Sequence, residues 1–186
     1  MKRVLVPLAE GFEELEAVTI IDMLRRAGVE VVVATLAGNP VRGSHGIALA
    51  ADATLDEVSG QEFDLLALPG GMPGAANLTA DPRIGAIIRR LHDSGMRVAA
   101  ICAAPMALAA AGVLTGRRAT AYPGFLDRAA DLTLVDEPVV VDDRVITSRG
   151  PGTALDFALE LVAQLQGPAA RQRIESQLQR NMTAQR

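Results

Sequence analysis

Residues 98–106, VAAICAAPM, pass from an apolar run to a helical pattern within nine positions. The run is short and uninterrupted, as in a strand buried on both faces, and Pro105 fits the first turn of a helix. Cys102 stands at the junction between small residues, which permit a sharp turn. The stretch therefore predicts a strand, a tight turn and a helix in direct succession, with the only cysteine of the chain at the turn.

The same alternation of strand and helix extends in both directions from this stretch. Strands are predicted at the apolar runs 4–8, 29–36, 64–68 and 97–101, with a weaker strand at 118–121 and a hairpin of 139–141 and 145–147. Helices are predicted at 13–27, 82–94, 105–111 and 152–166. Alternating strands and helices build βαβ units. We therefore expect an α/β fold with a mostly parallel sheet and helices on both faces.

The chain of 186 residues, with a mass of 19.5 kDa, fits one domain. We expect residues 1–167 to form this domain, because no repeat or low-complexity linker interrupts them. Residues 168–186 hold four arginines and one glutamate, with Ala170, Ile174 and Leu178 at helical spacing. This segment is predicted to be a terminal helix that docks on the domain and then frays.

The composition argues against several classes of protein. Eighteen Lys and Arg against twenty-two Asp and Glu give a formal net charge of −4, which offers no broad basic surface for nucleic acid or an anionic membrane. One Tyr, four Phe and no Trp leave no aromatic platform for stacking bases. A single Cys excludes an internal disulfide, and the lack of Cys and His clusters argues against a structural metal.

The apolar run at the amino terminus is interrupted at Glu10, too early for the core of a signal peptide. No stretch approaches the roughly 20 uninterrupted apolar residues that a membrane span needs. We therefore expect a cytoplasmic protein with neither nucleic acid nor a membrane as partner.

A site in such a fold is expected outside the carboxyl ends of the strands. After the first strand, residues 9–16 contain one glycine and four glutamates, and this negative charge at a helix start disfavours a bound phosphate. After the strand at 64–68, the sequence PGGMPG (69–74) allows a tight turn whose N–H groups face a ligand. No nucleotide or other cofactor is expected.

Cys102 is the candidate nucleophile. A strand-to-helix turn exposes the reactive atom above the sheet, and the next backbone N–H is free to stabilise an oxyanion. We expect the nearby helix start to lower the pKa of the thiol. The alternative is an inert, buried cysteine, because free Cys is among the most buried residue types. Ser148 lacks a Gly-x-Ser-x-Gly context, and Arg149 is interpreted as a tether for the turn that follows it.

Four segments, taken in order and with their spacing, resemble the ThiJ/PfpI superfamily, in the branch of the parkinsonism-associated deglycase and the bacterial YajL-type proteins. They are EELE (13–16), LPGG (68–71), AAICAAP (99–105) and TSRGPGT (147–153), and the resemblance runs from about residue 2 to residue 166. It implies a flavodoxin-like three-layer sandwich that forms a homodimer.

The resemblance also implies the residues of the site. Cys102 matches the reactive cysteine of the family, and Glu16 matches a protonated carboxyl group that hydrogen-bonds the thiolate. Gly71 and Ala103 match the backbone donors beside the sulfur. The helical pattern by itself favours Glu13, which lies nearer the centre of the apolar stripe. The choice of Glu16 therefore depends on the resemblance.

Two positions depart from the common family pattern and are accessory candidates. Tyr122 stands where many members have a histidine and YajL-type proteins an aromatic residue, and a phenol is a poor general base at neutral pH. His45 stands where relatives often have an arginine near the site across the dimer interface. Ala103 follows the cysteine where PfpI-type peptidases have a histidine, and no histidine occurs beyond His92. This argues against a peptidase triad.

We expect a cofactor-independent, cysteine-dependent enzyme of the glyoxalase or deglycase type, which converts methylglyoxal to lactate without glutathione. Its partner is a small aldehyde or a glycated substrate, with Cys102 as nucleophile and Glu16 as proton carrier. One alternative is a redox-sensing or chaperone protein that uses an oxidisable Cys102 without substrate turnover. The other is a dimeric binding domain in which the cysteine is buried and inert.

Overall fold

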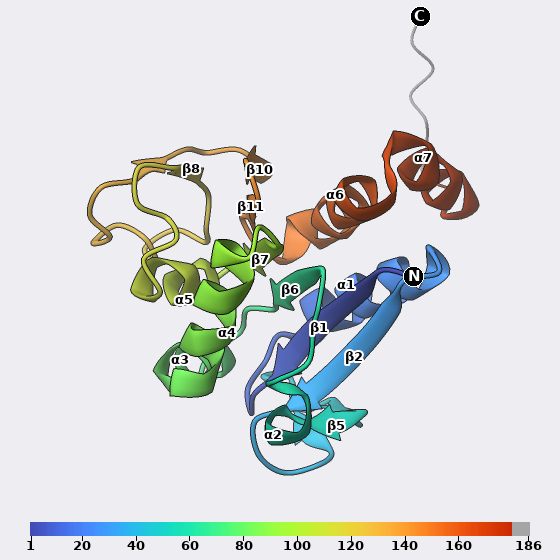
Figure 1. Ribbon diagram of the computed structural model, residues 1–186, viewed down its shortest axis with the longest axis horizontal. Coiled ribbons are helices and arrows are strands. Elements are labelled where there is room, and N and C mark those ends of the chain that lie inside the picture. The colour runs from blue at the N-terminus through green and yellow to red at the C-terminus, as the bar shows by residue number, and fades with distance from the viewer. Residues whose placement is uncertain (180–186) are drawn as a thin grey trace, which may run out of the picture.

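The computed structural model describes residues 1–179, and its framework is a seven-stranded sheet (Figure 1). Across the sheet the strands follow the order β10 (Val139–Asp142), β11 (Val145–Ser148), β7 (Arg97–Ile101), β6 (Leu65–Leu68), β1 (Arg3–Leu8), β2 (Glu30–Thr35), β5 (Ala53–Thr54). Within this sheet only β10 and β11 pair antiparallel, and the other neighbouring pairs are parallel. The expected mostly parallel α/β fold is confirmed.

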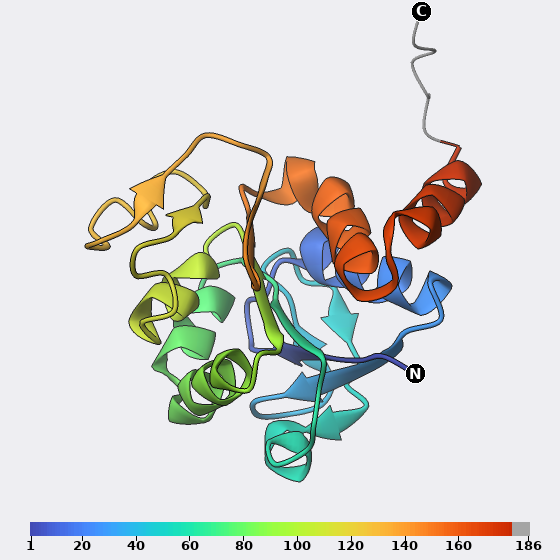
Figure 2. The same ribbon diagram turned by 45° about the horizontal axis from the view of Figure 1, so that its top comes forward.

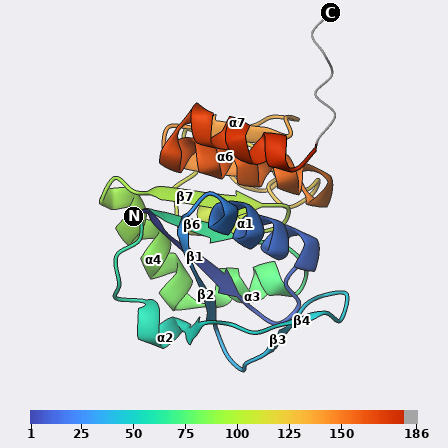
Figure 3. The same ribbon diagram turned by 90° about the vertical axis from the view of Figure 1, so that its right-hand side faces the viewer.

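Helices cover both faces of the sheet, which makes three layers. One face carries α1 (Glu14–Arg26), α6 (Ala154–Gln166) and α7 (Pro168–Gln177), and the other carries α3 (Gly74–Ala80), α4 (Pro82–Asp93) and α5 (Pro105–Ala110) (Figure 1). Figure 3 shows α6 and α7 side by side, and α6 also packs on α1. Turning the molecule as in Figure 2 brings α6 forward over the sheet.

The chain winds in two directions from the central strand β1. It passes through α1 to β2 on one side, and later enters β6 on the other side of β1 before continuing through α3 and α4 to β7. The loops that follow β1 and β6 therefore lead to opposite faces of the sheet. In doubly wound folds this switch point, at the carboxyl ends of the strands, is where ligands bind.

The long apolar runs form the elements that their patterns predict. Every residue of β6 is buried, as are Val98 to Ile101 of β7, and Ile20 and Leu24 of α1 are fully buried. Local caps define the helix ends. The Asp81 side chain accepts a hydrogen bond from the Arg83 N–H (2.9 Å) at the start of α4.

Several short elements escape prediction from the sequence. The two-residue strands β3 (Val41–Arg42) and β4 (Ala48–Leu49) form a small hairpin, and β9 (Thr133–Leu134) is equally short. It pairs with β8 (Arg118–Ala119), the weaker strand predicted at 118–121, which is present but only two residues long. The helix α2 (Leu55–Val58) and the 3-10 turn η1 (Pro151–Thr153) are similarly brief. Elements of this length carry no hydrophobic period, so tertiary contacts determine them.

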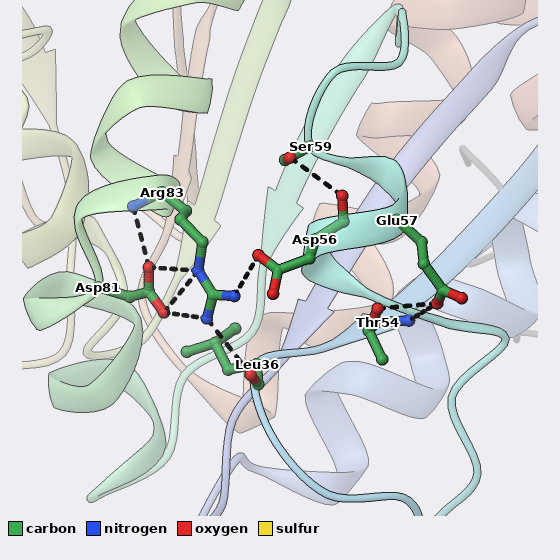
Figure 4. Close-up of polar contacts among 7 residues, drawn as sticks. All are labelled: Leu36, Thr54, Asp56, Glu57, Ser59, Asp81 and Arg83. Carbon is green, nitrogen blue, oxygen red and sulfur yellow. Dashed lines mark hydrogen bonds and ion pairs between the residues drawn. The ribbon is translucent and has the colours of Figure 1, made fainter.

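Arg83 links α2 to the start of α4 and to the end of β2 (Figure 4). Its guanidinium contacts Asp81 Oδ2 (2.6 Å) on its own helix, Asp56 Oδ1 (2.7 Å) on α2 and the carbonyl of Leu36 (3.3 Å) after β2. One side chain thus links the start of α4 to the end of β2 and to the short helix beside it.

The segment beyond residue 167 forms α7. Gly167 adopts φ +89°, which favours glycine, and the chain turns there from α6 into α7. Ala170 and Ile174 are buried. The expected frayed end falls largely on residues 180–186, which lie outside the described residues. Among residues 1–179, no helix has the length and apolar character needed to cross a bilayer.

Candidate active site

Cys102 occupies the sharp turn that follows β7. Its φ of +64° is in the left-handed region, which costs a residue with a side chain of the order of 1–3 kcal/mol. Two backbone hydrogen bonds hold this conformation: Cys102 N–H donates to the Ser148 carbonyl (2.9 Å), and Tyr122 N–H donates to the Cys102 carbonyl (2.9 Å). The residue is buried, with 8% of its surface exposed. The turn predicted from VAAICAAPM is therefore present.

Glu16, in the first turn of α1, is fully buried. Its Oε2 accepts a hydrogen bond from the backbone N–H of Gly70 (2.8 Å), whereas Oε1 has no hydrogen-bond partner among the described residues. Ionising a carboxyl group this deeply buried is costly, so burial favours its protonated form.

Gly70 shows how closely Glu16 and Cys102 approach each other. A Cβ atom added at Gly70 would lie 2.7 Å from Cys102 Cβ and 2.8 Å from Glu16 Oε2. Only a residue without a side chain fits between them. The structure therefore brings together side chains from α1 and from the end of β7, with the loop after β6 between them.

The electrostatics of this pair follow from its burial. Desolvation, with the negative charge of Glu13 nearby, raises the pKa of Glu16 to about 7, against the opposing hydrogen bond from Gly70. Desolvation and the neighbouring Glu16 charge raise the pKa of Cys102 to about 12. The backbone N–H groups of Gly71 and Ala103 hydrogen-bond the sulfur and act in the opposite direction.

The raised pKa of Cys102 differs from the expectation of a low pKa at a helix start. The helix concerned, α5, has six residues, and its influence is outweighed by burial and by a carboxylate beside the sulfur. The Glu16 carboxylate and the Cys102 thiolate repel each other, so ionisation of one group disfavours ionisation of the other. A proton on Glu16 removes the repulsion, so the thiolate is favoured when Glu16 is protonated.

The neighbouring glutamates have other tasks. Glu13 lies outside α1 as its N-cap, where its carboxylate accepts the N–H of Glu16 (2.8 Å). Glu14 is buried and accepts hydrogen bonds from the backbone N–H groups of His45 (2.7 Å) and Ile47 (3.2 Å). The sequence did not single out Glu14, although a Cβ at Gly43 would collide with it at 2.2 Å. Glu14 therefore anchors the loop 43–47.

His45 belongs to this anchor. Its Nδ1 lies 3.0 Å from Glu14 Oε2 and 3.6 Å from Glu13 Oε1, and the hydrogen bond to Glu14 raises the pKa of His45. Its ring is largely exposed. Although these three side chains place ligand atoms within 4.8 Å of one another, both Glu14 oxygens already accept bonds from the loop. The polar contacts that the described residues give His45 do not lead to the sulfur.

Tyr122 and Arg149 flank the cysteine from the other side. Tyr122 is 49% exposed, and its ring meets Phe125 edge-on with centroids 6.2 Å apart. Arg149 forms an ion pair with Asp136, and its N–H donates to the Pro138 carbonyl (3.2 Å), in agreement with a tether. Ser148 is buried, and its hydroxyl donates to the same carbonyl (2.8 Å).

This arrangement defines a class of protein: a flavodoxin-like α/β sandwich with a cysteine on a strand-to-helix turn beside a buried carboxyl group. Sequence comparison shows which family this is. The sequence profile of the DJ-1/PfpI family matches residues 2–164, and the chain belongs to that family.

Individual relatives agree with this assignment. Parkinson disease protein 7 homolog of Danio rerio is 41% identical over 95% of this chain and 96% of its own length. A protein of Caenorhabditis elegans named glutathione-independent glyoxalase DJR-1.2 is 38% identical over 86% of each chain. The solved structure of oxidized DJ-1 from Toxoplasma gondii superposes with a TM-score of 0.91 at 41% identity, covering 96% of this chain and 98% of the other.

Some relatives are longer than this chain. The DJ-1 homologs B and A of Arabidopsis thaliana are each 42% identical over 89% of this chain, which spans only 39% and 43% of their lengths. The matched region in them is therefore one part of a larger protein.

Proposed function

We propose that this protein is a glutathione-independent glyoxalase that converts methylglyoxal and related 2-oxoaldehydes to 2-hydroxy acids. The observation that carries the proposal is the fully buried Glu16 carboxyl beside Cys102, so close that a Cβ atom at Gly70 would lie within 2.8 Å of both side chains. The name of the Caenorhabditis elegans relative supports the same activity.

The first step is addition of sulfur to the aldehyde carbon. Glu16 has a pKa of about 7, so it accepts the thiol proton near neutral pH while the C–S bond forms. The carbonyl π electrons move to the aldehyde oxygen, which takes up a proton to give a hemithioacetal. The N–H groups of Gly71 and Ala103 hydrogen-bond the sulfur, and we assign them the role of stabilising negative charge during the addition.

The second step moves a proton between adjacent carbons. A carboxylate beside the hemithioacetal removes the proton from the former aldehyde carbon, the electron pair forms a double bond to the neighbouring carbonyl carbon, and the ketone oxygen takes up a proton to give an enediol. Return of a proton to that second carbon, with loss of the hydroxyl proton on the first, gives a thioester of the hydroxy acid. Water then cleaves the thioester, releasing lactate and the Cys102 thiol. The sum is methylglyoxal plus water to lactic acid, with no external oxidant or reductant.

Lactate formed from methylglyoxal without glutathione tests the proposal. We expect Cys102→Ser to abolish turnover, because the nucleophile is lost. Glu16→Gln should remove most of the turnover while the fold remains intact, because the proton carrier is lost. The matched control is Ser148→Ala, which alters a buried hydroxyl on the adjacent strand. Full activity in Cys102→Ser would refute the mechanism.

Absence of Cys102-dependent lactate would instead favour the redox-sensing role. In that case mild peroxide, followed by intact-mass analysis, is expected to add oxygen at Cys102 before any methionine reacts. If neither Cys102-dependent lactate nor preferential oxidation of Cys102 is observed, the remaining alternative is a binding domain with an inert cysteine.

A further inference from the structure

Two hollows share a wall formed by Tyr122, Pro123 and Arg149, which belong to the segments hydrogen-bonded to the Cys102 backbone. The first has a volume of about 410 Å³ and is completed by the turn 150–153. The second has a volume of about 360 Å³ and is bounded by residues 120–124 and 134–136, together with Arg149. The proposed chemistry at Cys102 and Glu16 uses neither hollow.

The shared wall has a defined position relative to the nucleophile. Tyr122 N–H donates to the Cys102 carbonyl, and Cys102 N–H donates to the carbonyl of Ser148, the residue before Arg149. A Cβ atom added at Gly150 would lie 3.3 Å from Cδ2 of Tyr122, so the tyrosine ring lies over the Gly150 backbone. Both segments of the wall are thus fastened to the backbone of Cys102.

Charge distinguishes the two hollows. Among residues 1–179, Arg149 is the only charged residue that lines the first hollow, whereas the second is also lined by Asp127 and Asp136. The first hollow therefore suits an anionic group, and the second repels one.

Arg149 is able to exchange its partner. Its side chain is 40% exposed and that of Asp136 is 87% exposed, and an ion pair this open to water contributes about 0–1 kcal/mol. A guanidinium presents a planar fork of N–H groups that matches a carboxylate. A substrate carboxylate that reaches the first hollow can therefore replace Asp136.

We propose that the first hollow is a subsite for the anionic tail of the substrate, with Arg149 as its ligand and Tyr122 as its wall. The inference rests on the proposed glyoxalase function and narrows the substrate class. The preferred substrates are 2-oxoaldehydes that carry a carboxylate on the side away from the aldehyde carbon.

The kinetic test compares 4,5-dioxopentanoate, which has a carboxylate tail, with the neutral 2-oxopentanal. We expect Arg149→Gln to lower the ratio of kcat/KM for the anionic over the neutral substrate by about tenfold, since a charge-assisted contact is lost. Asp136→Asn is expected to raise this ratio, because it frees the guanidinium. Arg118→Gln is the matched control, since Arg118 is also a half-exposed arginine in an ion pair but lines neither hollow.

A binding measurement separates this inference from the proposed function. Tyr122 is the only tyrosine, and the chain has no tryptophan, so the intrinsic fluorescence reports on the wall that the two hollows share. In Cys102→Ser, 4-oxopentanoate is expected to change this fluorescence in a saturable way, and 2-pentanone is not. The response should vanish in Cys102→Ser/Arg149→Gln.

The outcomes are distinct. Without turnover of any oxoaldehyde the proposed function fails, and the fluorescence titration alone decides the subsite. A substrate ratio unchanged by Arg149→Gln, or a fluorescence response independent of Arg149, would overturn the subsite.

Discussion

Glu14 and Glu16 lie two positions apart on α1 and are both buried, yet their environments shift their pKa values in opposite directions. Burial opposes the ionisation of Glu14, but hydrogen bonds from the His45 side chain and from the loop backbone outweigh it and lower the pKa to about 2. Glu16 receives one backbone hydrogen bond, so desolvation prevails and raises its pKa to about 7. The number of donors facing each carboxyl group decides the direction.

These shifts predict opposite effects of pH on stability. For Glu16, the unfolded chain ionises at its ordinary pKa of 4.5 while the folded chain keeps the proton, so stability is fully present below pH 4.5 and is lost as pH rises to about 7. For Glu14, stability is present above pH 4.5 and is lost as pH falls toward 2. Each shift corresponds to about 3 kcal/mol.

Urea unfolding of the native chain, Glu14→Gln and Glu16→Gln across a pH series measures both effects. As pH rises from 4.5 to 7, the free energy of unfolding of Glu16→Gln should increase relative to that of the native protein. As pH falls below 4.5, the free energy of unfolding of Glu14→Gln should approach that of the native protein. Each glutamine variant controls for the other, since both remove a charge from the same helical turn. Stability curves that stay parallel at all pH values would contradict the assignment.

Gly70 makes the contact between Cys102 and Glu16 possible. In Gly70→Ala the added Cβ requires the cysteine or the glutamate to move. We expect loss of most lactate formation and a decrease of about 1–3 kcal/mol in the free energy of unfolding. The control is Gly60→Ala, where a Cβ meets no atom within 4 Å, and it should leave both properties unchanged. Native activity in Gly70→Ala would show that the site is looser than the geometry indicates.

At the level of elements, the short segments between β2 and β6 depend on side-chain contacts because they lack a hydrophobic period. Arg83 is the principal contact: it joins α4 to α2 through Asp56 and to the end of β2 through the Leu36 carbonyl (Figure 4). A carbonyl and two carboxylates bound by one guanidinium form a network, in which the contributions reinforce one another.

We expect Arg83→Gln to lower the free energy of unfolding by about 1–2 kcal/mol, because hydrogen bonds to charged groups are lost at a partly buried position. Urea unfolding of Arg83→Gln is compared with that of Arg89→Gln, an exposed position on the same helix. The difference between their free energies of unfolding measures the effect of the network. Equal stability of the two variants would mean that the network contributes nothing.

For the molecule as a whole, one surface of α1 carries exposed apolar side chains. Leu15 is 52% exposed, Val18 is 45% exposed, and Ile47, whose N–H is bound to Glu14 at the start of the helix, is 58% exposed. A hollow of about 260 Å³ beside Val18 continues this surface toward Ile21 and Leu49. An apolar surface of this kind suits burial against a second copy of the chain.

We therefore expect a homodimer, with a sedimentation-equilibrium mass twice the 19.5 kDa of the chain. Val18→Asp should give the monomer mass, because it places a charge in the apolar surface. Val141→Asp is the control, since Val141 is 37% exposed on the edge strand β10 and away from α1. A native monomer, or a dimer that survives Val18→Asp, would exclude this surface as the interface.

Sequence alone was sufficient for features that depend on neighbours along the chain. The strands β1, β2, β6 and β7 and the helices α1, α4 and α6 lie within about two residues of their predicted bounds, because apolar period and end caps are local properties. The turn at Cys102 was predictable for the same reason.

Tertiary structure decided the chemistry. The helical pattern favours Glu13, but Glu13 is the N-cap of α1, and it is Glu16 that points into the site. Desolvation by the segments packed around Glu16 raises its pKa, and the opposing hydrogen bond comes from Gly70, 54 positions away. The raised pKa of Cys102 likewise depends on desolvation by distant segments. Desolvation and charge repulsion act through space, so no local pattern in the sequence records them.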